Sequence, residues 1–518
     1  MSEREWESMD EKEFESMLEG SVSEVPSEYI VAEVTPWKKA MNRALAGITL
    51  CAVTLNFWRL DYILPAVGMV LSLLGFRGLR RENRWFWGCF AITVVRAAYF
   101  FPILILNTTI VQSTAVAHPV ALALTIVNLL LLLAEFFCIW RGLRAVQGKV
   151  GLPRRAGGAV ALMIWYGLMC ILAVIRYNGL IVPGAILIAY FFIIRNIYKL
   201  SKELDEAGYS IQAASVRIPD RGIVLTIAAV LIIGCAAGYR FGGSYSMAWK
   251  AVSPFEHAEV ESVKNRLIQL GVPEYVLDDL TAEDIAACEG ALRVVVDVTD
   301  EPVNSGRTVT TTEYIGDGRR HIRQSTVYDV KELRITGVGV QLPGERERWI
   351  IFHHFLWTTD PGFYGTESIQ LWPVYRDISE GWVSAGEATG RVLYDRDGTT
   401  FSAPYHSIGE QTFTSGGIFW GERSSTDVFA TFSMPKKGER YRGYVAYPVA
   451  ETQDGYIISS WFNYTHQRSW LQYPAVTAME KRMTSWSNDA GAFLTVQDAL
   501  QFYPTEEGIE LINAAATE

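Results

Sequence analysis

Seven apolar stretches between residues 38 and 241 constrain the fold of this chain more than any other feature. A bilayer core about 30 Å thick needs about 20 apolar residues at the rise of an α-helix. Each stretch has or approaches that length, and we therefore expect a bundle of about seven transmembrane helices over residues 37–241. The stretches lie at residues 38–58, 60–76, 85–107, 119–140, 158–175, 178–194 and 222–241.

Arginine-rich motifs predict the orientation of this bundle. Phe76-Arg77-Gly78-Leu79-Arg80 ends the second stretch, and Trp140-Arg141-Gly142-Leu143-Arg144 ends the fourth. With the N-terminus in the cytosol, the cytosolic segments carry 17 Lys and Arg residues and the external connections carry 3. Lys and Arg collect on the cytoplasmic side of membranes. The sequence thus predicts a multi-pass plasma-membrane protein with a cytosolic N-terminus and everything after residue 241 outside the cytosol.

Charge is segregated along the chain, which also argues for separate regions. Residues 1–36 hold 11 acidic and 2 basic residues, residues 37–241 hold 7 and 21, and residues 242–518 hold 38 and 23. We expect residues 1–36 to be an acidic cytosolic tail, either disordered or a short amphipathic helix that binds a cytosolic protein. The basic charge belongs to the membrane region, so nucleic acid is not an expected partner.

The external part divides into three segments. Residues 242–290 contain a capping box at Ser253-Pro254-Phe255-Glu256 and a second helix start at Thr281, and we expect a small helical neck there. Residues 291–474 carry strand patterns, and residues 475–518 are expected to hold helices at 475–487 and 495–503 and then a tail.

The strand region predicts an extracytoplasmic all-β domain, sandwich or jelly-roll-like. Turn dipeptides separate runs rich in Val, Ile, Thr, Tyr and Phe, which is typical of hairpins. The clearest expected hairpins are residues 391–405 and 441–462. The dipeptides are Asp317-Gly318, Asp397-Gly398, Lys437-Gly438 and Asp454-Gly455.

Four residues of the membrane region have two possible roles. Arg96 and Glu135 lie within apolar stretches, where an unpaired charge is costly, and we expect them to pair with each other. The pair is either part of a proton or ion path or a packing contact. Gly234 and Gly238 form a small-residue face, which serves either a dimer or packing against the chain's own bundle.

Aromatic density marks the external domain. Trp and Tyr rings on a β-domain can stack on sugar rings or on a peptide, whereas the same rings also build cores. We take an envelope or extracellular glycan, cell-wall component or protein as the expected ligand. The candidate binding residues are Tyr364, Trp372, Tyr375, Trp420 and Trp461.

Motifs for catalysis are lacking in the sequence. It contains no Gly-x-Ser-x-Gly, P-loop, His-Glu-x-x-His or Cys-x-x-Cys motif, so the sequence leans against an enzyme without deciding the question, and we expect no cofactor or metal. His353 and His354 are adjacent on an expected strand, so they point to opposite faces. In layout alone the chain resembles membrane-bound anti-sigma factors, whose His-x-x-x-Cys-x-x-Cys motif it lacks.

The leading prediction is therefore a membrane protein that binds or senses a ligand outside the cytosol through its β domain. A transporter or transporter-accessory subunit is the first alternative, based on Arg96 and Glu135. An extracytoplasmic glycosidase is the second, because two carboxylates about 5 to 9.5 Å apart suffice for that chemistry.

Overall fold

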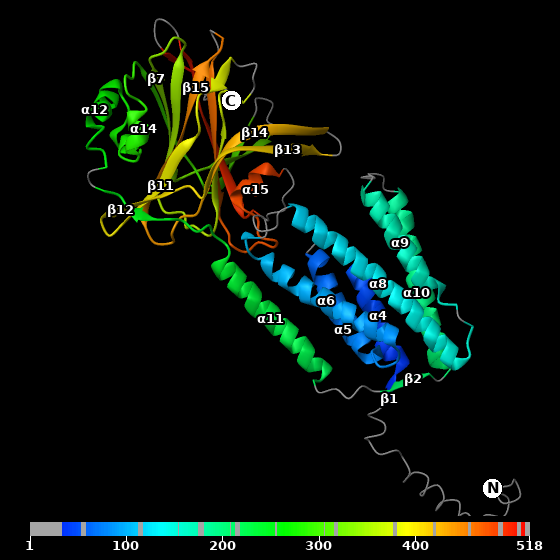
Figure 1. Ribbon diagram of the computed structural model, residues 1–518. Helices are drawn as coiled ribbons and strands as arrows, with labels where there is room; N and C mark the ends of the chain where they lie inside the picture. Colours follow the sequence, from blue (N-terminus) through cyan, green and yellow to red (C-terminus); the bar gives the residue numbers. More distant parts are fainter. Residues whose placement is uncertain are drawn as a thin grey trace, which may run out of the picture. The chain divides into compact units, whose positions relative to one another are not determined.

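A computed structural model of the 518-residue chain forms two compact units, one helical and one dominated by β-sheets (Figure 1). The first comprises Met1–Leu106 and Thr114–Cys235, and the second comprises Asn107–Ser113 and Ala236–Glu518. The described residues are 34–52, 59–111, 118–153, 155–174, 181–207, 209–212, 218–253, 256–304, 306–314, 320–376, 381–417, 421–453, 457–484, 491–504 and 509–512.

Seven long helices are described at the positions of the seven apolar stretches. They are α4 (Trp37–Ala52), α5 (Leu60–Leu79), α6 (Arg84–Leu106), α8 (His118–Val150), α9 (Gly157–Val174), α10 (Ile181–Glu206) and α11 (Asp220–Phe241). Within the described residues, 5 are long and apolar enough to cross a membrane, and these are α5, α6, α8, α10 and α11. The helices α4 and α9 are the shorter two, at 16 and 18 residues.

Glycines bring α4 and α5 together in the helical unit. A Cβ placed on Gly75 would lie 2.5 Å from the backbone nitrogen of Ala44, and one on Gly68 would lie 2.6 Å from the carbonyl oxygen of Gly47. Only residues without side chains allow backbones this close, as is common between membrane helices. Around this pair, α5 contacts α6, α6 contacts α8, α8 contacts α9, and α10 contacts both α9 and α4. The short strands β1 (Val34–Pro36) and β2 (Ser210–Gln212) pair with each other.

The second unit contains two large antiparallel sheets. One has the order β3-β12-β11-β15-β8-β7-β4, with β10 also paired to β15, and the other has the order β13-β14-β9-β16-β17-β18. The first sheet comprises β3 (Lys250–Ala251), β4 (Val294–Glu301), β7 (Leu333–Leu342), β8 (Arg348–Trp357), β10 (Trp382–Ser384), β11 (Thr389–Arg396), β12 (Thr399–Pro404) and β15 (Glu439–Glu451). The second comprises β9 (Glu367–Trp372), β13 (Ser407–Gly417), β14 (Gly421–Phe432), β16 (Ile458–Gln467), β17 (Phe493–Pro504) and β18 (Ile509–Leu511). A separate hairpin joins β5 (Arg307–Tyr314) to β6 (Arg320–Val327).

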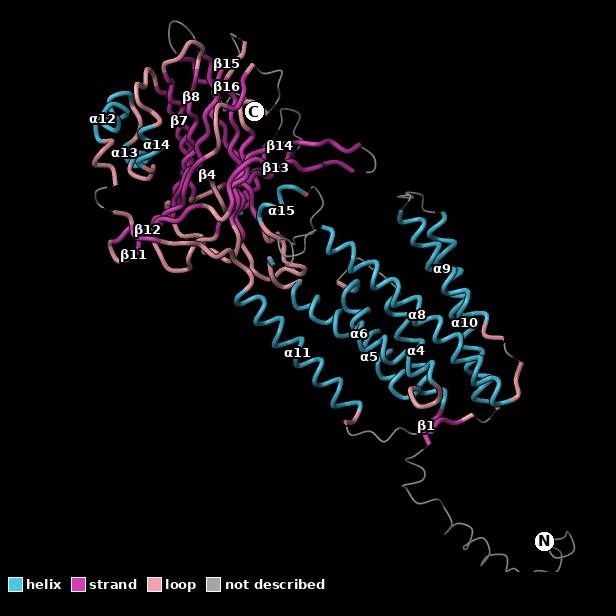
Figure 2. Tube along the Cα trace, in the orientation of Figure 1, coloured by secondary structure: helices cyan, strands magenta, loops and turns pink. Residues whose placement is uncertain are grey.

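Apolar side chains that alternate with other residues along the strands give the two sheets a common core. Ile335 and Ile351 from the first sheet and Leu371 and Phe462 from the second belong to one buried cluster. The opposite face of the first sheet carries a second cluster, in which Phe352 and residues of the neck helices are buried together. Figure 2 shows these helices beside β7 and β8. Those helices are α12 (Glu261–Leu270), α13 (Glu274–Leu277) and α14 (Ala282–Ala286). On the other side of the unit, α15 (Ala478–Met483) packs against β9 and β16.

Several sequence predictions are confirmed at the level of individual elements. The 391–405 segment is a hairpin of β11 and β12, and Asp397 and Gly398 at its turn both have positive φ, as the Asp-Gly turn requires. The helix expected at Thr281 is α14, for which Thr281 is the N-cap: its side chain accepts a hydrogen bond from the amide of Asp284. Gly271, with φ 105°, ends the first neck helix.

Three local predictions were wrong. The first neck helix, α12, begins at Glu261, eight residues after Ser253, where the expected capping box starts; residues 254–255 of that box lie outside the described residues. The 441–462 segment is not a hairpin, because β15 and β16 belong to different sheets and line the shared core from opposite sides. The expected helix at 495–503 is strand β17, where Val496, Leu500 and Phe502 point into the core with strand periodicity.

Candidate functional site

The candidate ligand-binding residues fall in different places within the β-sheet unit. Tyr364 lines a cavity, whereas Trp372 and Trp461 pack on each other across β9 and β16. The hydroxyl of Tyr375 donates a hydrogen bond to Glu410 at 3.0 Å, and its ring packs on buried Tyr447. Trp420 lies outside the described residues. The predicted set is therefore not one site.

The Tyr364 cavity has a volume of about 400 Å³, is open on one side and is lined mainly by loops at strand ends. Tyr364 itself is 43% exposed, so its ring is available at the surface of the cavity. The loop that carries it turns at Gly362, with φ 77°, and the amide of Gly362 donates to the side chain of Asp360 at 2.9 Å. The other lining residues are Val303, Asn304, Val330, Glu332, Thr359, Asp360, Pro361, His466 and Arg468.

Buried His466 lines this cavity and is paired with a buried carboxylate that does not line it. Nδ1 of His466 lies 3.1 Å from both carboxylate oxygens of Glu367, a residue with no exposed surface. Burial raises the pKa of Glu367, while the neighbouring His466 opposes that rise. The His466 ring is also held edge-on by Phe363, the residue before Tyr364. The pair therefore fixes one polar wall of the cavity and ties it to the Tyr364 loop.

Charged groups of both signs complete the lining. Glu332 accepts a hydrogen bond from the amide of Val303 at 2.8 Å, which orients its carboxylate. Arg468 is exposed and follows His466 on the same strand end, and its amide donates to Ala492 at 2.7 Å. An aromatic ring beside a guanidinium and carboxylates can stack on an apolar ring face and hydrogen-bond its polar edge. The lining thus combines an aromatic ring with charged groups of both signs.

A second aromatic cluster lies on the outer face of the second sheet. The rings of Trp372 and Trp461 are 5.8 Å apart, and the Arg376 guanidinium lies 4.6 Å from the Trp372 ring. Buried Asp427 holds Arg376 at 2.7 Å and also accepts from Gln370 at 2.6 Å. These side chains largely satisfy each other, which makes this surface more rigid but less open than the Tyr364 cavity.

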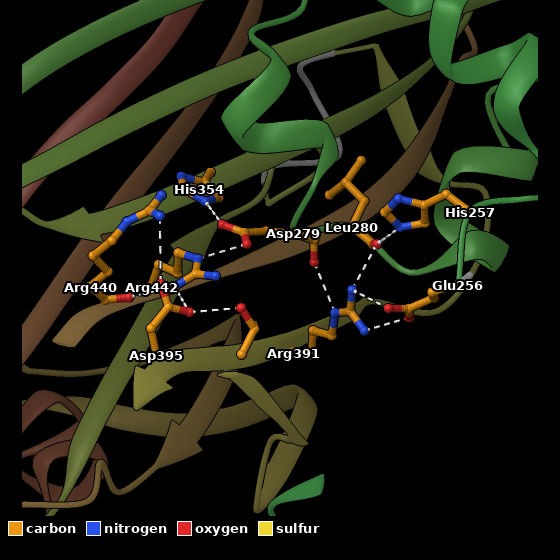
Figure 3. A network of polar contacts seen from close by, with 10 residues as sticks. Glu256, His257, Asp279, Leu280, His354, Arg391, Asp395, Arg440 and Arg442 are labelled. Atoms are coloured by element: carbon orange, nitrogen blue, oxygen red, sulfur yellow. Dashed lines mark hydrogen bonds and ion pairs between the residues drawn. The ribbon is translucent and has the colours of Figure 1, made fainter. Parts of the chain in front are cut away.

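A buried charge network beneath the neck is the feature that sequence reasoning missed (Figure 3). The carboxylate of Asp279 lies 2.8 Å from Nε2 of His354 and accepts a hydrogen bond from Nε of Arg442 at 2.7 Å. Arg391 donates to the backbone oxygen of Asp279 at 2.8 Å and forms a two-pronged ion pair with Glu256. The residues of this network come from the neck and from β8, β11 and β15, so no local sequence signal marks the network.

Burial alone would raise the pKa of Asp279, but His354 and Arg442 more than offset this and hold that pKa below its ordinary value.

On the opposite face of β8, Nε2 of His353 lies 2.7 Å from the hydroxyl oxygen of Ser460, and burial lowers the pKa of His353 to about 3. The two histidines therefore point to opposite faces, as predicted. Within the described residues, no group of three or more His, Cys, Asp or Glu side chains could hold a metal ion.

The four candidate residues of the predicted membrane region all contact other residues of the chain. Arg96 of α6 forms an ion pair with Glu135 of α8, and the Glu135 side chain has no exposed surface. The hydroxyl of Thr93 lies 3.2 Å from the other carboxylate oxygen of Glu135. A Cβ on Gly234 would lie 2.5 Å from Ile105, and one on Gly238 would lie 2.0 Å from Thr108, so both glycines meet the chain's own residues.

Comparisons with known proteins add little to this picture. No family model and no curated protein matches the chain. Two solved structures that it is similar to are described as "Pore forming protein" and "Clostridium perfringens delta-toxin", each 7% identical in sequence with a TM-score of 0.18. The alignments cover 39% and 43% of this chain and 100% of those chains. A TM-score this low supports no inference about fold or function.

Proposed function

We propose that this chain is an integral membrane protein whose extracytoplasmic β domain binds an envelope or extracellular ligand in the Tyr364 cavity. The observation that carries the proposal is the cavity of about 400 Å³, in which an exposed tyrosine lies among charged side chains and buried His466, a residue held by Glu367. Binding sites are concave and combine aromatic surface with a few oriented polar groups. A glycan, with apolar ring faces and hydroxyl edges, fits that chemistry.

The proposal includes the membrane arrangement predicted from the sequence. We propose that α4 and α9 span the bilayer together with the five longer apolar helices, and that the two sheets form a sandwich-like domain. The 17 to 3 distribution of Lys and Arg supports a cytosolic N-terminus and an external β domain. Residues 1–36 are proposed to bind a cytosolic protein, through which ligand binding is signalled inward.

The orientation is testable with one introduced thiol. Ser424 is exposed on β14, so Ser424→Cys places a reactive group on the surface of the β domain. A membrane-impermeant maleimide should label this variant in intact cells as strongly as in permeabilised cells. Labelling that requires permeabilisation would place the domain on the cytosolic side and refute the orientation.

A transporter is the second candidate, and Arg96 and Glu135 are the residues that favour it. Both Glu135 carboxylate oxygens are already contacted, one by Arg96 and one by Thr93. Such a closed set favours a packing contact over a proton or ion path, because a relay needs a group free to exchange protons or bind cargo. We propose the packing role for this pair.

The ligand proposal is tested by the binding of full-length protein, purified in detergent, to an array of soluble oligosaccharides and muropeptides. Wild-type protein should be retained by at least one class of probe. Tyr364→Ala should weaken that binding about tenfold, since ring stacking contributes on the order of 1 kcal/mol, and Tyr364→Phe should keep it. Hydrolysis of a retained probe would instead favour the glycosidase alternative.

The matched control is Tyr503→Ala. Tyr503 is exposed to the same 43% as Tyr364 but is absent from the cavity lining. Its replacement should leave retention unchanged. Equal loss in both variants, or no retention of the wild-type protein by any probe, would overturn the proposal.

A further inference from the structure

The helical unit contains a second cavity, with a lining unlike that of the Tyr364 cavity. It has a volume of about 560 Å³ and lies where the end of α5, the start of α6 and the start of α11 meet. Three of its lining residues are arginines, Arg77, Arg80 and Arg81. The remaining wall is apolar and consists of Leu73, Phe90, Val94, Ile218 and Ile223.

One of the three arginines is fixed by contacts within the protein. The Arg77 side chain is 9% exposed, lies 3.2 Å from Asp220 and donates to the backbone oxygen of Ile218. Asp220 also pairs with Arg43 of α4 at 2.8 Å. Its single negative charge is thus already shared by two guanidinium groups. The Arg77–Asp220 pair joins α11 to α5, and Arg77 forms part of the cavity wall.

The other two arginines have no carboxylate partner in the described part of the chain. Arg80 is half-buried, and its guanidinium lies 5.4 Å from the ring of Phe90, while Arg81 is exposed. Burial and the nearby charges of Arg77 and Arg81 lower the pKa of Arg80. The cavity therefore holds positive charge that no described group neutralises, which is the condition for binding an anion.

The position of the cavity selects the kind of anion. The 20 residues of α5 extend for about 30 Å, the thickness of a bilayer core, so arginines just beyond its end lie at headgroup depth. The apolar wall includes Val94, which is 41% exposed and lies deeper along α6. A ligand with a phosphate at one end and acyl chains at the other matches both parts of the lining.

We propose that this cavity binds the headgroup phosphate of an anionic phospholipid, with Arg80 and Arg81 contacting the phosphate and the apolar wall contacting an acyl chain. Basic pockets between helices on the cytosolic side are known to hold lipid headgroups of this class. The inference rests on the proposed membrane insertion but is independent of the ligand of the β domain.

The chain provides a matched control in its second arginine motif. Arg144 occupies the position that Arg80 has in the first motif, and Arg141 is the other arginine of the second motif. Both stack on Trp85 or Trp140 instead of lining the cavity. Arg80→Gln/Arg81→Gln and Arg141→Gln/Arg144→Gln remove the same two charges from the helical unit. General attraction of anionic lipid would fall equally in both, whereas a specific site would respond only to the first.

The test is native mass spectrometry of the full chain in detergent with added dioleoyl phosphatidylglycerol, dioleoyl phosphatidylcholine or inorganic phosphate. Phosphatidylglycerol should bind in preference to the other two. Arg80→Gln/Arg81→Gln should weaken that binding by roughly tenfold to thirtyfold, and Arg141→Gln/Arg144→Gln by less than about threefold. Arg80→Lys/Arg81→Lys should restore most of it, since the charge is kept.

Equal losses in the two glutamine variants would overturn the site, as would binding of inorganic phosphate without preference for lipid. Flotation with phosphatidylglycerol vesicles separates this failure from that of membrane insertion. Protein that does not float with vesicles would refute insertion itself. Protein that floats but shows no preferential lipid adduct would refute only the proposed cavity function.

Discussion

Two buried ion clusters, one in each unit, compensate their charges in different ways. In the helical unit, Glu135 is contacted by Thr93 and Arg96, both from the neighbouring helix α6. In the β-sheet unit, Asp279 is contacted by His354 and Arg442, which are 75 and 163 residues away in the sequence. Helices satisfy a buried charge through an adjacent helix, whereas the sheet and neck gather partners from distant strands.

The comparison predicts different consequences when a carboxylate is removed. The Asp279 cluster joins the neck to three strands, so its loss affects several elements. The Glu135 pair joins two helices that also have extensive apolar contacts, so its loss should remain local. Breaking a buried pair by deleting one partner leaves the other charge buried and uncompensated.

Asp279→Ala should have the largest effect on stability. The Arg442 side chain, 7% exposed, would keep only Asp395 as a charged partner, and Arg391 would face a disturbed backbone. We expect a loss of about 3 to 5 kcal/mol in the free energy of unfolding of the β domain. Hydrogen exchange of β8 amides in the full chain, as a function of urea, measures this opening.

The control for this prediction is Asp300→Ala. Asp300 also forms a two-pronged pair with an arginine, Arg334, at 2.8 and 3.1 Å, but its side chain is 40% exposed. Its removal should cost about 1 kcal/mol or less. If both substitutions gave the same small effect, the neck network would not stabilise the domain as argued.

Glu135→Leu should have the next largest effect. Arg96 would remain among apolar helices without its carboxylate partner, at a cost of about 2.5 to 3.5 kcal/mol. The thiol of buried Cys89 is a convenient reporter, because it lies 3.7 Å from the backbone oxygen of Glu135. A thiol-reactive dye should label Cys89 at a lower temperature in this variant than in the wild-type protein.

The double variant Arg96→Leu/Glu135→Leu decides whether the pair itself is required. With both charges gone, apolar packing replaces the ion pair, and the labelling temperature should return close to that of the wild-type protein. A double variant that stays as unstable as Glu135→Leu would show that the side chains do more than neutralise each other.

The same contrast explains which parts of the molecule were predictable from sequence. Arg96 and Glu135 were paired in advance because charged residues are rare within apolar stretches. Asp279 could not be chosen among the 38 acidic residues after residue 241, since its partners are brought to it only by the sheet order. The opposite directions of His353 and His354 followed from strand alternation alone, whereas the helix expected at 495–503 failed because the period-two pattern of β17 was overlooked.

Tyr364 illustrates a partial success of the same kind. A Gly- and Pro-containing loop indicated an accessible aromatic residue, and the residue is exposed in a cavity. His466, which lines the cavity, and its partner Glu367 were not anticipated. They lie 99 residues apart and meet only because β9 and β16 pair in the second sheet.

The smallest predicted effect concerns a partly buried carboxylate for which no basic partner is described. Burial, reinforced by Asp297 and Glu301, raises the pKa of Asp498 from 3.8 to about 6. The folded protein therefore bears a cost above pH 6 that disappears as the pH falls below 3.8, because the carboxyl is then protonated in both folded and unfolded states. Asp279, with its lowered pKa, behaves oppositely: it stabilises the fold above pH 3.8 and loses that contribution in stronger acid.

Asp498→Asn should accordingly stabilise the β domain at pH 7 by about 1 to 2 kcal/mol, allowing for its partial exposure, and should have no effect near pH 3.5. Hydrogen exchange of β17 amides across this pH range measures the difference. Asp397→Asn is the control, since the Asp397 side chain is 93% exposed at a turn where asparagine is equally suitable. A gain that did not vary with pH would mean that Asp498 is not the charged, uncompensated counterpart of Asp279 and Glu135, and the contrast between paired and unpaired carboxylates would fail at this position.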